Sequence, residues 1–182
     1  MSALHPLVPQ TLDRLHQLAA ISDEDGVLSR TFLSPAMARA NALVAGWMKP
    51  LGAEVSEDGW GNLIGRFPGA APGAGTLLLG SHLDTVPNAG IFDGPLGVLV
   101  ALAALESLAV RGVRLPFAVD VLAFSDEEGT RFHSAYLGSG ALTGQLTGAD
   151  FDRRDAAGIS VRGSADRCAQ GARPHRRRLL RV

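Results

Sequence analysis

Features that define several other classes of protein are scarce in this sequence of 182 residues. Its one cysteine, Cys168, excludes an internal disulfide framework and fits a reducing compartment. The net charge is only −1, so no overall field attracts the chain to nucleic acid or to an anionic membrane. The longest apolar run, residues 98–105, is too short to cross a bilayer, and the N-terminal segment lacks the basic start and apolar run of a secretory signal. We therefore expect a cytoplasmic protein with neither nucleic-acid nor membrane partners.

What the sequence does contain is typical of a packed α/β domain, with 46% hydrophobic and 19% charged residues. Apolar positions at helical spacing predict two amphipathic helices, and Ser34 followed by Pro35 predicts where the second begins. We expect the run TLLLGS, residues 76–81, to form a strand buried on both faces. The expected helices cover residues 11–20, 35–49 and 96–110, and the expected strands cover residues 53–57, 62–67, 76–81 and 117–125.

Charged residues follow two of these strands directly. GSHLDTV, with His82 and Asp84, ends the strand over 76–81, and FSDEEGT, with Glu127 and Glu128, ends the strand over 117–125. A strand, a helix and another strand in this order indicate a largely parallel sheet, in which ligands collect at the carboxyl ends of the strands. Asp93 lies in the intervening loop, in GIFDGPLG. We therefore expect all five side chains to meet in one crevice.

A divalent cation would make this crowding of charge tolerable. Several carboxylates at the end of a buried sheet are costly to desolvate, and histidine with carboxylates is a ligand set for zinc or manganese. His82 and Asp84 project to the same side of an extended chain, so the Asp84 carboxylate can accept the second imidazole N–H. Glu127 and Glu128 point in different directions, so one can bind metal while the other moves a proton. Taken singly, each residue is typical of a loop histidine, a turn or a solvated charge pair; their conjunction favours a metal site.

The same residues carry a resemblance to a known family. GSHLDTVPNAGIFDGPLGV followed by FSDEEGTRF resembles the two-metal hydrolases of the aminoacylase/carboxypeptidase superfamily. FDGPLG, EEGTRF and the later LGSGALTG resemble its N-carbamoyl-amino-acid hydrolase and allantoate amidohydrolase branch more than its peptidase branch. The resemblance runs from about residue 12 to about residue 161 and includes WGNLIGRFPG.

The resemblance implies a fold, a cofactor and a role for each residue. The fold is α/β, a three-layer, zinc-aminopeptidase-like, mixed and largely parallel sheet flanked by helices, here incomplete at the C-terminal side. His82 would bind the first of two divalent ions, Asp93 would bridge both and Glu128 would bind the second, with zinc favoured over manganese or cobalt. The catalytic residues would be Glu127, as general base, and Asp84, as the partner of His82. The implied reaction is hydrolysis of a small linear amide or ureido compound, such as an N-carbamoyl amino acid or allantoate.

The sequence also departs from that family, whose members are at least about twice as long. They use two further histidine ligands and an inserted lid domain, which mediates homodimerisation and helps to bind substrate. His5, His16, His133 and His175 are not convincing replacements for these ligands. We therefore expect weak metal binding and weak activity. The alternatives are a peptidase or deacylase of the same superfamily, and an inactive fragment that binds only metal or a partner.

The composition changes near residue 153. We assign residues 1–152 to the N-terminal part of the catalytic metal-binding domain and residues 153–182 to an irregular arginine-rich tail. That tail shows neither helical nor strand periodicity. It is interpreted as a solvated tail, as a nucleic-acid arm, or as translation that has left its reading frame. The third interpretation is favoured, because GC-rich coding read out of frame tends to yield Arg, Ala, Gly and Pro. The nucleic-acid arm is disfavoured, because the segment lacks interleaved aromatic residues and a recognisable binding fold.

Overall fold

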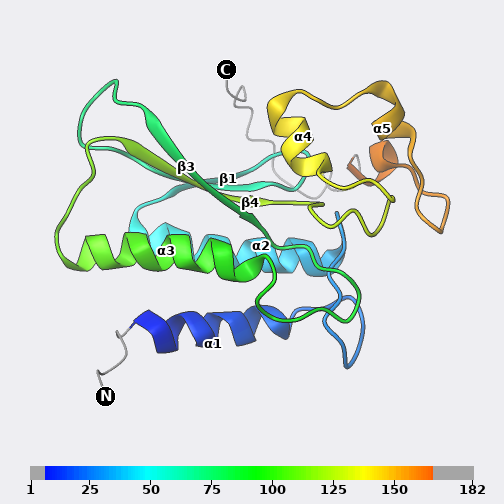
Figure 1. Cartoon of the computed structure of the whole chain (residues 1–182), viewed down its shortest axis with the longest axis horizontal. Helices are drawn as coiled ribbons and strands as arrows, with labels where there is room; N and C mark the ends of the chain where they lie inside the picture. Colours follow the sequence, from blue (N-terminus) through cyan, green and yellow to red (C-terminus); the bar gives the residue numbers. More distant parts are fainter. Residues whose placement is uncertain (1–6, 166–182) are drawn as a thin grey trace.

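The computed structural model describes residues 7–165, which form one mixed sheet flanked by helices (Figure 1). The sheet order is β1-β2-β4-β3. The helices are α1 (Leu7–Ala19), α2 (Pro35–Met48), α3 (Pro95–Val110), α4 (Leu137–Thr143) and α5 (Gly148–Asp152), with a short 3-10 helix, η1, at Lys49–Leu51. The strands are β1 (Glu54–Glu57), β2 (Leu63–Phe67), β3 (Thr76–His82) and β4 (Ala118–Phe124). In this part of the chain no helix combines the length and the hydropathy needed to span a membrane.

The start of α2 confirms the sequence prediction in atomic detail. Ser34 has extended backbone angles, and its side-chain oxygen accepts the backbone N–H of Met37 at 3.1 Å. Pro35 occupies the first helical position, where its missing N–H costs nothing. The expected strands and the third helix also appear within a residue or two of the predicted bounds.

The sheet is mixed, as expected, but its parallel share is smaller than predicted. Among the strands of residues 7–165, only β3 and β4 pair in parallel; β2 pairs antiparallel with both β1 and β4. β1 and β2 pair antiparallel because the chain reverses in the turn between them, where the Asp58 N–H donates to the Asn62 carbonyl at 3.1 Å. The parallel pair is the one that matters for the site, because it brings the carboxyl ends of β3 and β4 to the same edge.

The main hydrophobic core lies between one face of the sheet and the helices α2 and α3, and α1 packs on α3 (Figure 1). Alternate residues of β2 and β4 point into this core, as a half-buried sheet requires. Its fully buried members include Leu63, Val121, Met48 and Leu102. This packing fixes the two strands whose ends carry the charged residues.

The prediction that β3 is buried on both faces is wrong. β3 is an edge strand, and Leu77 and Leu78 are 45% and 48% exposed. An apolar run indicates that a strand can be buried, but in residues 7–165 only β4 pairs with β3. The exposed leucines therefore leave apolar surface at the edge of the sheet.

The polypeptide remains packed beyond Asp152, where the sequence predicted an irregular tail. Arg154 and Ser160 form an isolated antiparallel bridge, and Val161 is fully buried. Val161 shares a second core cluster with Phe32, Phe132 and Leu137, at the end of the molecule that carries α4 and α5 (Figure 1). One buried valine gives no periodic pattern, so sequence reasoning could not detect this packing. The interpretations offered for residues 166–182 lie outside the described residues.

Candidate metal centre

The parallel pairing of β3 and β4 sets up the site. His82 ends β3 and lies in register with Phe124, the last residue of β4. Asp84 follows His82 by two residues, and Glu127 and Glu128 follow β4 after a short turn. The strand ends therefore deliver both charged segments to one edge of the sheet, as the sequence predicted.

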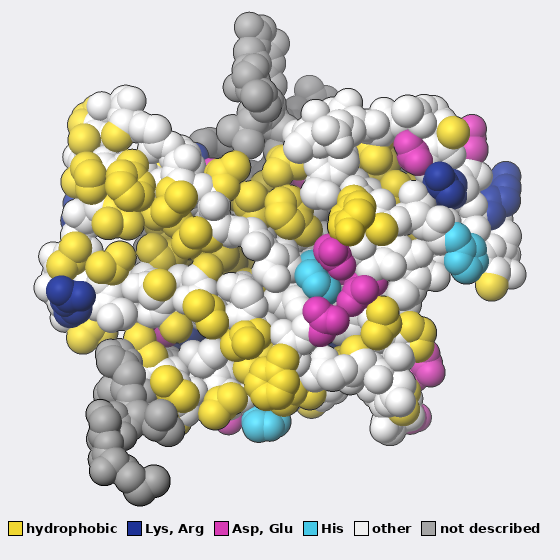
Figure 2. Space-filling model, viewed as in Figure 1, with side chains coloured by type: hydrophobic (Ala, Val, Ile, Leu, Met, Phe, Trp, Pro, Cys, Tyr) yellow, Lys and Arg dark blue, Asp and Glu magenta, His cyan; other side chains and the backbone are white. Residues whose placement is uncertain are grey.

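Three of the five predicted site residues offer ligand atoms close to one another. One atom each from His82, Asp93 and Glu128 lies within 4.8 Å of the others. His82 is buried, Glu128 is half-buried and Asp93 is exposed. Figure 2 shows acidic side chains gathered around a histidine on the surface of the molecule. The cluster is therefore open to solvent on one side, where a substrate could approach.

The imidazole of His82 has one nitrogen anchored and one directed at the carboxylates. Its Nδ1 lies 2.9 Å from the backbone carbonyl of Asp84. Its Nε2 lies 3.8 Å from Asp93 Oδ1 and 3.7 Å from Glu127 Oε2. A proton on Nδ1, donated to that carbonyl, leaves Nε2 free to bind a cation.

Sequence reasoning chose the wrong atom of Asp84 as the acceptor for this N–H. The carboxylate lies 3.6 Å from Nδ1, beyond hydrogen-bond length, because it faces the other charged segment. Its Oδ1 accepts the backbone N–H of Glu127 and its Oδ2 accepts that of Glu128, both at 3.1 Å. Asp84 therefore ties the two strand ends together rather than orienting the ring alone.

The electrostatics of the cluster favour a bound cation. Burial lowers the pKa of His82, but the interactions with Asp84 and the charge of Glu127 outweigh it and raise the pKa to about 9. Burial raises the pKa of Glu128; the charge of His82 opposes this shift, and the neighbouring carboxylates Asp93, Glu127 and Asp84 add to it. Neighbouring carboxylates contribute to both shifts, beside burial at Glu128, and a divalent cation would offset their negative charge.

The donor set fits a divalent metal ion. One imidazole nitrogen and two carboxylates make three protein ligands, the usual number at a catalytic zinc site. In residues 7–165 the other two histidines do not extend this set: His16 is exposed on α1 and His133 is exposed in a turn. His5 and His175 lie outside the described residues.

Sequence reasoning missed two groups beside the cluster. Gly94 has φ of +81°, and a Cβ placed there would lie 2.5 Å from the His82 ring. Only glycine fits this close approach, but a glycine beside an aspartate reads in the sequence as an ordinary turn. Asp126 is buried, and its Oδ2 has no hydrogen-bond partner among the described residues. Burial and the charge of Asp84 raise the pKa of Asp126 to about 8, although a backbone hydrogen bond and Arg131 oppose the shift.

Arg30 is a third group that sequence reasoning missed, in the segment between α1 and α2. It is fully buried, which is rare for an arginine. Burial lowers its pKa to about 10, and the charges of Asp84 and Asp23 oppose that shift, so Arg30 remains a cation at neutral pH. Its sequence neighbours, Ser29 and Thr31, gave no signal that it would lie beside the site.

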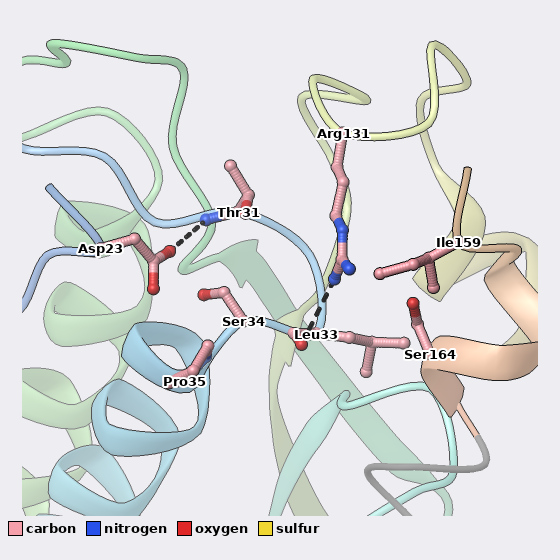
Figure 3. A pocket seen from close by; sticks show the side chains of 8 residues that line it. All are labelled: Asp23, Thr31, Leu33, Ser34, Pro35, Arg131, Ile159 and Ser164. Carbon is pink, nitrogen blue, oxygen red and sulfur yellow. Dashed lines mark hydrogen bonds between the residues drawn. The ribbon is translucent and has the colours of Figure 1, made fainter. Parts of the chain in front are cut away.

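A cavity of about 630 Å³ lies apart from the predicted site residues, none of which lines it. Figure 3 shows Arg131 pointing into this cavity opposite Asp23 and the start of α2. The Arg131 guanidinium is already occupied: it donates to the Phe32 carbonyl at 2.7 Å and to the Asp155 carboxylate at 2.9 Å. Arg131 therefore joins the turn after the acidic pair to two distant segments, and we assign this cavity no role in the chemistry.

Comparison with known proteins identifies the family. Residues 62–156, more than half of the sequence, match the family described as Peptidase family M28. The chain belongs to peptidase family M28. Among curated proteins, this M28 chain is 44% identical over 155 residues to allantoate deiminase 2 of Glycine max. It is 42% identical over 149 residues to an N-carbamoyl-L-amino acid amidohydrolase of Geobacillus stearothermophilus. These relatives confirm the amidohydrolase resemblance seen in the sequence motifs.

The structure of the M28 chain is similar to that of a hydantoinase/carbamoylase family amidase from Burkholderia ambifaria. The TM-score is 0.81 at 36% sequence identity, over 88% of this chain and 40% of that one. This similarity confirms the fold class predicted from the sequence. The match to the Glycine max protein includes 84% of this chain but only 32% of that relative. It therefore spans about a third of the length of such relatives.

Proposed function

We propose that this chain carries part of the active site of a metal-dependent hydrolase that cleaves a linear amide or ureido C–N bond. The observation that carries the proposal is the convergence of His82, Asp93 and Glu128 from three separate segments. Relatives named as allantoate deiminase and N-carbamoyl-L-amino acid amidohydrolase support the substrate class. We propose allantoate or an N-carbamoyl amino acid as the substrate.

The proposed cofactor is a pair of divalent ions, zinc before manganese or cobalt. His82 would hold the first ion, Glu128 the second, and Asp93 would lie between them. The three described donors suffice for one ion, so the second ion depends on further ligands. Bound cations would supply positive charge that favours deprotonation of water and stabilises a negative oxygen.

Glu127 is the proposed general base. Its carboxylate lies 3.7 Å from His82 Nε2, at the edge of the cluster, and about a third of the side chain is exposed to solvent. In the proposed reaction Glu127 takes a proton from water as the water oxygen bonds to the ureido or amide carbon. It then gives that proton to the departing nitrogen as the C–N bond breaks. Asp84 fixes the backbone that carries Glu127 and thus its approach to the water.

The proposal extends to the cellular setting and the assembly. A single cysteine fits a reducing cytoplasm. We propose that the partner of this site is a small molecule and that full-length relatives form homodimers; the proposal assigns no oligomeric state to this chain. The assignment of residues 1–152 to the metal-binding domain also belongs to this proposal.

Two other functions have specific support. The family description names peptidases, which favours a peptidase or deacylase. The three donors that converge in residues 7–165 suffice to hold one ion, which favours a polypeptide that binds metal without turnover. The relatives' names and the EEGTRF motif favour the ureido hydrolase over the peptidase.

The test is ammonia release from allantoate and N-carbamoyl-L-amino acids with added zinc, manganese or cobalt, beside amino-acid release from dipeptides and N-acyl amino acids. Ammonia release that Glu127→Gln abolishes, with metal content unchanged, supports the proposal. Turnover that survives Glu127→Gln removes Glu127 as the base. Turnover of peptides or N-acyl amino acids alone supports the second function, and metal binding without turnover supports the third.

A further inference from the structure

The guanidinium of Arg30 bonds to three separate points of the backbone. Its Nε donates to the Leu83 carbonyl at 2.7 Å, and its Nη1 donates to the carbonyls of Leu18 and Ile21, both at 2.8 Å. In residues 7–165 no carboxylate hydrogen-bonds to this guanidinium, although Arg30 is fully buried. A planar group with five N–H donors can reach three carbonyls at once, which a lysine cannot match in geometry.

The backbone of Arg30 also forms hydrogen bonds with residues 83–85. Its N–H donates to Thr85 Oγ1 at 3.0 Å, and its carbonyl accepts the Thr85 N–H at 2.9 Å. Leu83 is held by the side chain and Thr85 by the backbone, so Arg30 fixes both neighbours of Asp84. Thr85 is itself buried, which shields these bonds from competition with water.

The hydrogen bonds from Arg30 to Leu83 and Thr85 lie next to the metal centre. Asp84 lies between these two residues and is 1% exposed, and its carboxylate accepts the N–H groups of Glu127 and Glu128. Its backbone carbonyl also anchors the ring of His82. The buried positive charge of Arg30 attracts the buried negative charge of Asp84, which lowers the cost of burying both. A shift of the 83–85 segment would therefore move three of the proposed site residues together.

We propose that Arg30 is a positioning residue for the metal centre, which fixes residues 83–85 so that Asp84 holds the Glu127–Glu128 turn in place. This inference rests on the proposed function, because the value of the positioning lies in that site. Arg30 acts through Asp84 and does not touch the reacting atoms. A competing, purely structural role also exists: the carbonyls of Leu18 and Ile21 lie at the end of α1, which the guanidinium caps.

The two roles differ in what moves when Arg30 is replaced. Arg30→Met removes the guanidinium and keeps an apolar chain of similar length. Arg14→Met is a matched control, because Arg14 is also a largely buried arginine; it ties α1 to α3 through Glu106 at 2.7 Å. Both variants perturb the packing of α1, but only Arg30→Met removes the side-chain bond to the Leu83 carbonyl and so loosens residues 83–85.

The experiment measures backbone amide exchange at Glu127 and Glu128 in the full chain, and zinc affinity by competition with a chromophoric chelator. We expect Arg30→Met to speed exchange at both amides by at least about tenfold, because those N–H groups lose their fixed acceptor. We expect a loss of zinc affinity of roughly 10- to 100-fold, the usual effect of removing a group that orients metal ligands. Arg14→Met should change neither quantity.

A milder variant keeps the test decisive if Arg30→Met does not fold. Thr85→Val removes only the hydroxyl that accepts the Arg30 N–H, and should speed exchange at Glu127 and Glu128 to a smaller extent. Equal exchange in the variants and the unaltered chain, or equal effects of Arg30→Met and Arg14→Met, would overturn the inference. Because amide exchange needs no metal, this outcome is separable from failure of the proposed function, in which the unaltered chain binds no zinc.

Discussion

The carboxylate of Asp84 accepts the backbone N–H of Glu127 at 3.1 Å, across 43 residues of sequence. This bond joins the segment after β3 to the segment after β4, and its twin to Glu128 completes a two-point connection. A carboxylate suits this task because both of its oxygens are acceptors. The connection holds two adjacent strand ends together at one edge of the site.

Asp84→Asn tests that connection. An asparagine offers one oxygen and one NH₂ group, so it can accept only one of the two N–H groups and sets a donor against the other. Leaving a buried amide unpaired costs about 1–3 kcal/mol, and the free energy of unfolding in urea should fall by at least that amount, because the variant also loses the charge that attracts buried Arg30. Asp13→Asn, at an exposed position on α1, should have little effect. Similar losses in both variants would show that the bonds to Glu127 and Glu128 contribute nothing specific.

Gly94→Ala tests the close approach between the loop and the His82 ring. The added methyl group would lie 2.5 Å from the ring, and the φ of +81° disfavours any side chain. The ring must move, so affinity for zinc should fall by roughly tenfold or more. Gly90→Ala is the control on the same loop, because a Cβ there meets nothing within 4 Å. Equal zinc affinity in the two variants would contradict the geometry.

The fold was largely predictable from the sequence, except for features that depend on tertiary contacts. Ser34 and Pro35 located the start of α2 because capping is a local effect. The burial of β3 was predicted wrongly, because an apolar run reports what a strand can bury and not whether a neighbour covers it. α4 and α5 were not predicted, since they are short and rich in glycine and polar residues.

The charged residues of the site were also chosen from the sequence alone, because their positions after apolar runs indicate strand ends. The structure brings His82, Asp93 and Glu128 together; their roles as ligands, and that of Glu127 as base, stay predictions. Arg30 could not be found in this way. Its hydrogen-bond partners are backbone carbonyls. Every type of residue has one, so the sequence does not indicate which residues bind Arg30.

Arg66→Met gives a pH-dependent prediction on the sheet. Arg66 donates to both carboxylate oxygens of its cross-strand partner Asp120, at 3.1 and 3.2 Å. Burial raises the pKa of Asp120 above 3.8, and the charge and hydrogen bonds of Arg66 lower it. Without Arg66 the pKa of folded Asp120 rises further, so the folded state retains its proton at a pH where the unfolded state has lost it.

The sign of the effect follows from this difference. Below pH 3.8 Asp120 is neutral in both states, and Arg66→Met should lose little stability. As the pH rises the variant should lose stability relative to the unaltered chain. The loss at pH 7 should stay below about 1 kcal/mol, because Arg66 is 43% exposed and its charge is screened. Arg114→Met, at an exposed position, serves as control in urea unfolding from pH 3 to 7. A difference that does not vary with pH would contradict the assignment.

The central claim is that three separate segments form a cation site, and a zinc titration of the purified chain tests it most directly. We predict binding of about one zinc ion, as three protein ligands allow. His82→Ala should weaken that binding by at least roughly tenfold. His16→Ala, at an exposed position on α1, should leave it unchanged. Binding of equal strength in the unaltered chain and in His82→Ala, or no binding in either, would contradict the account.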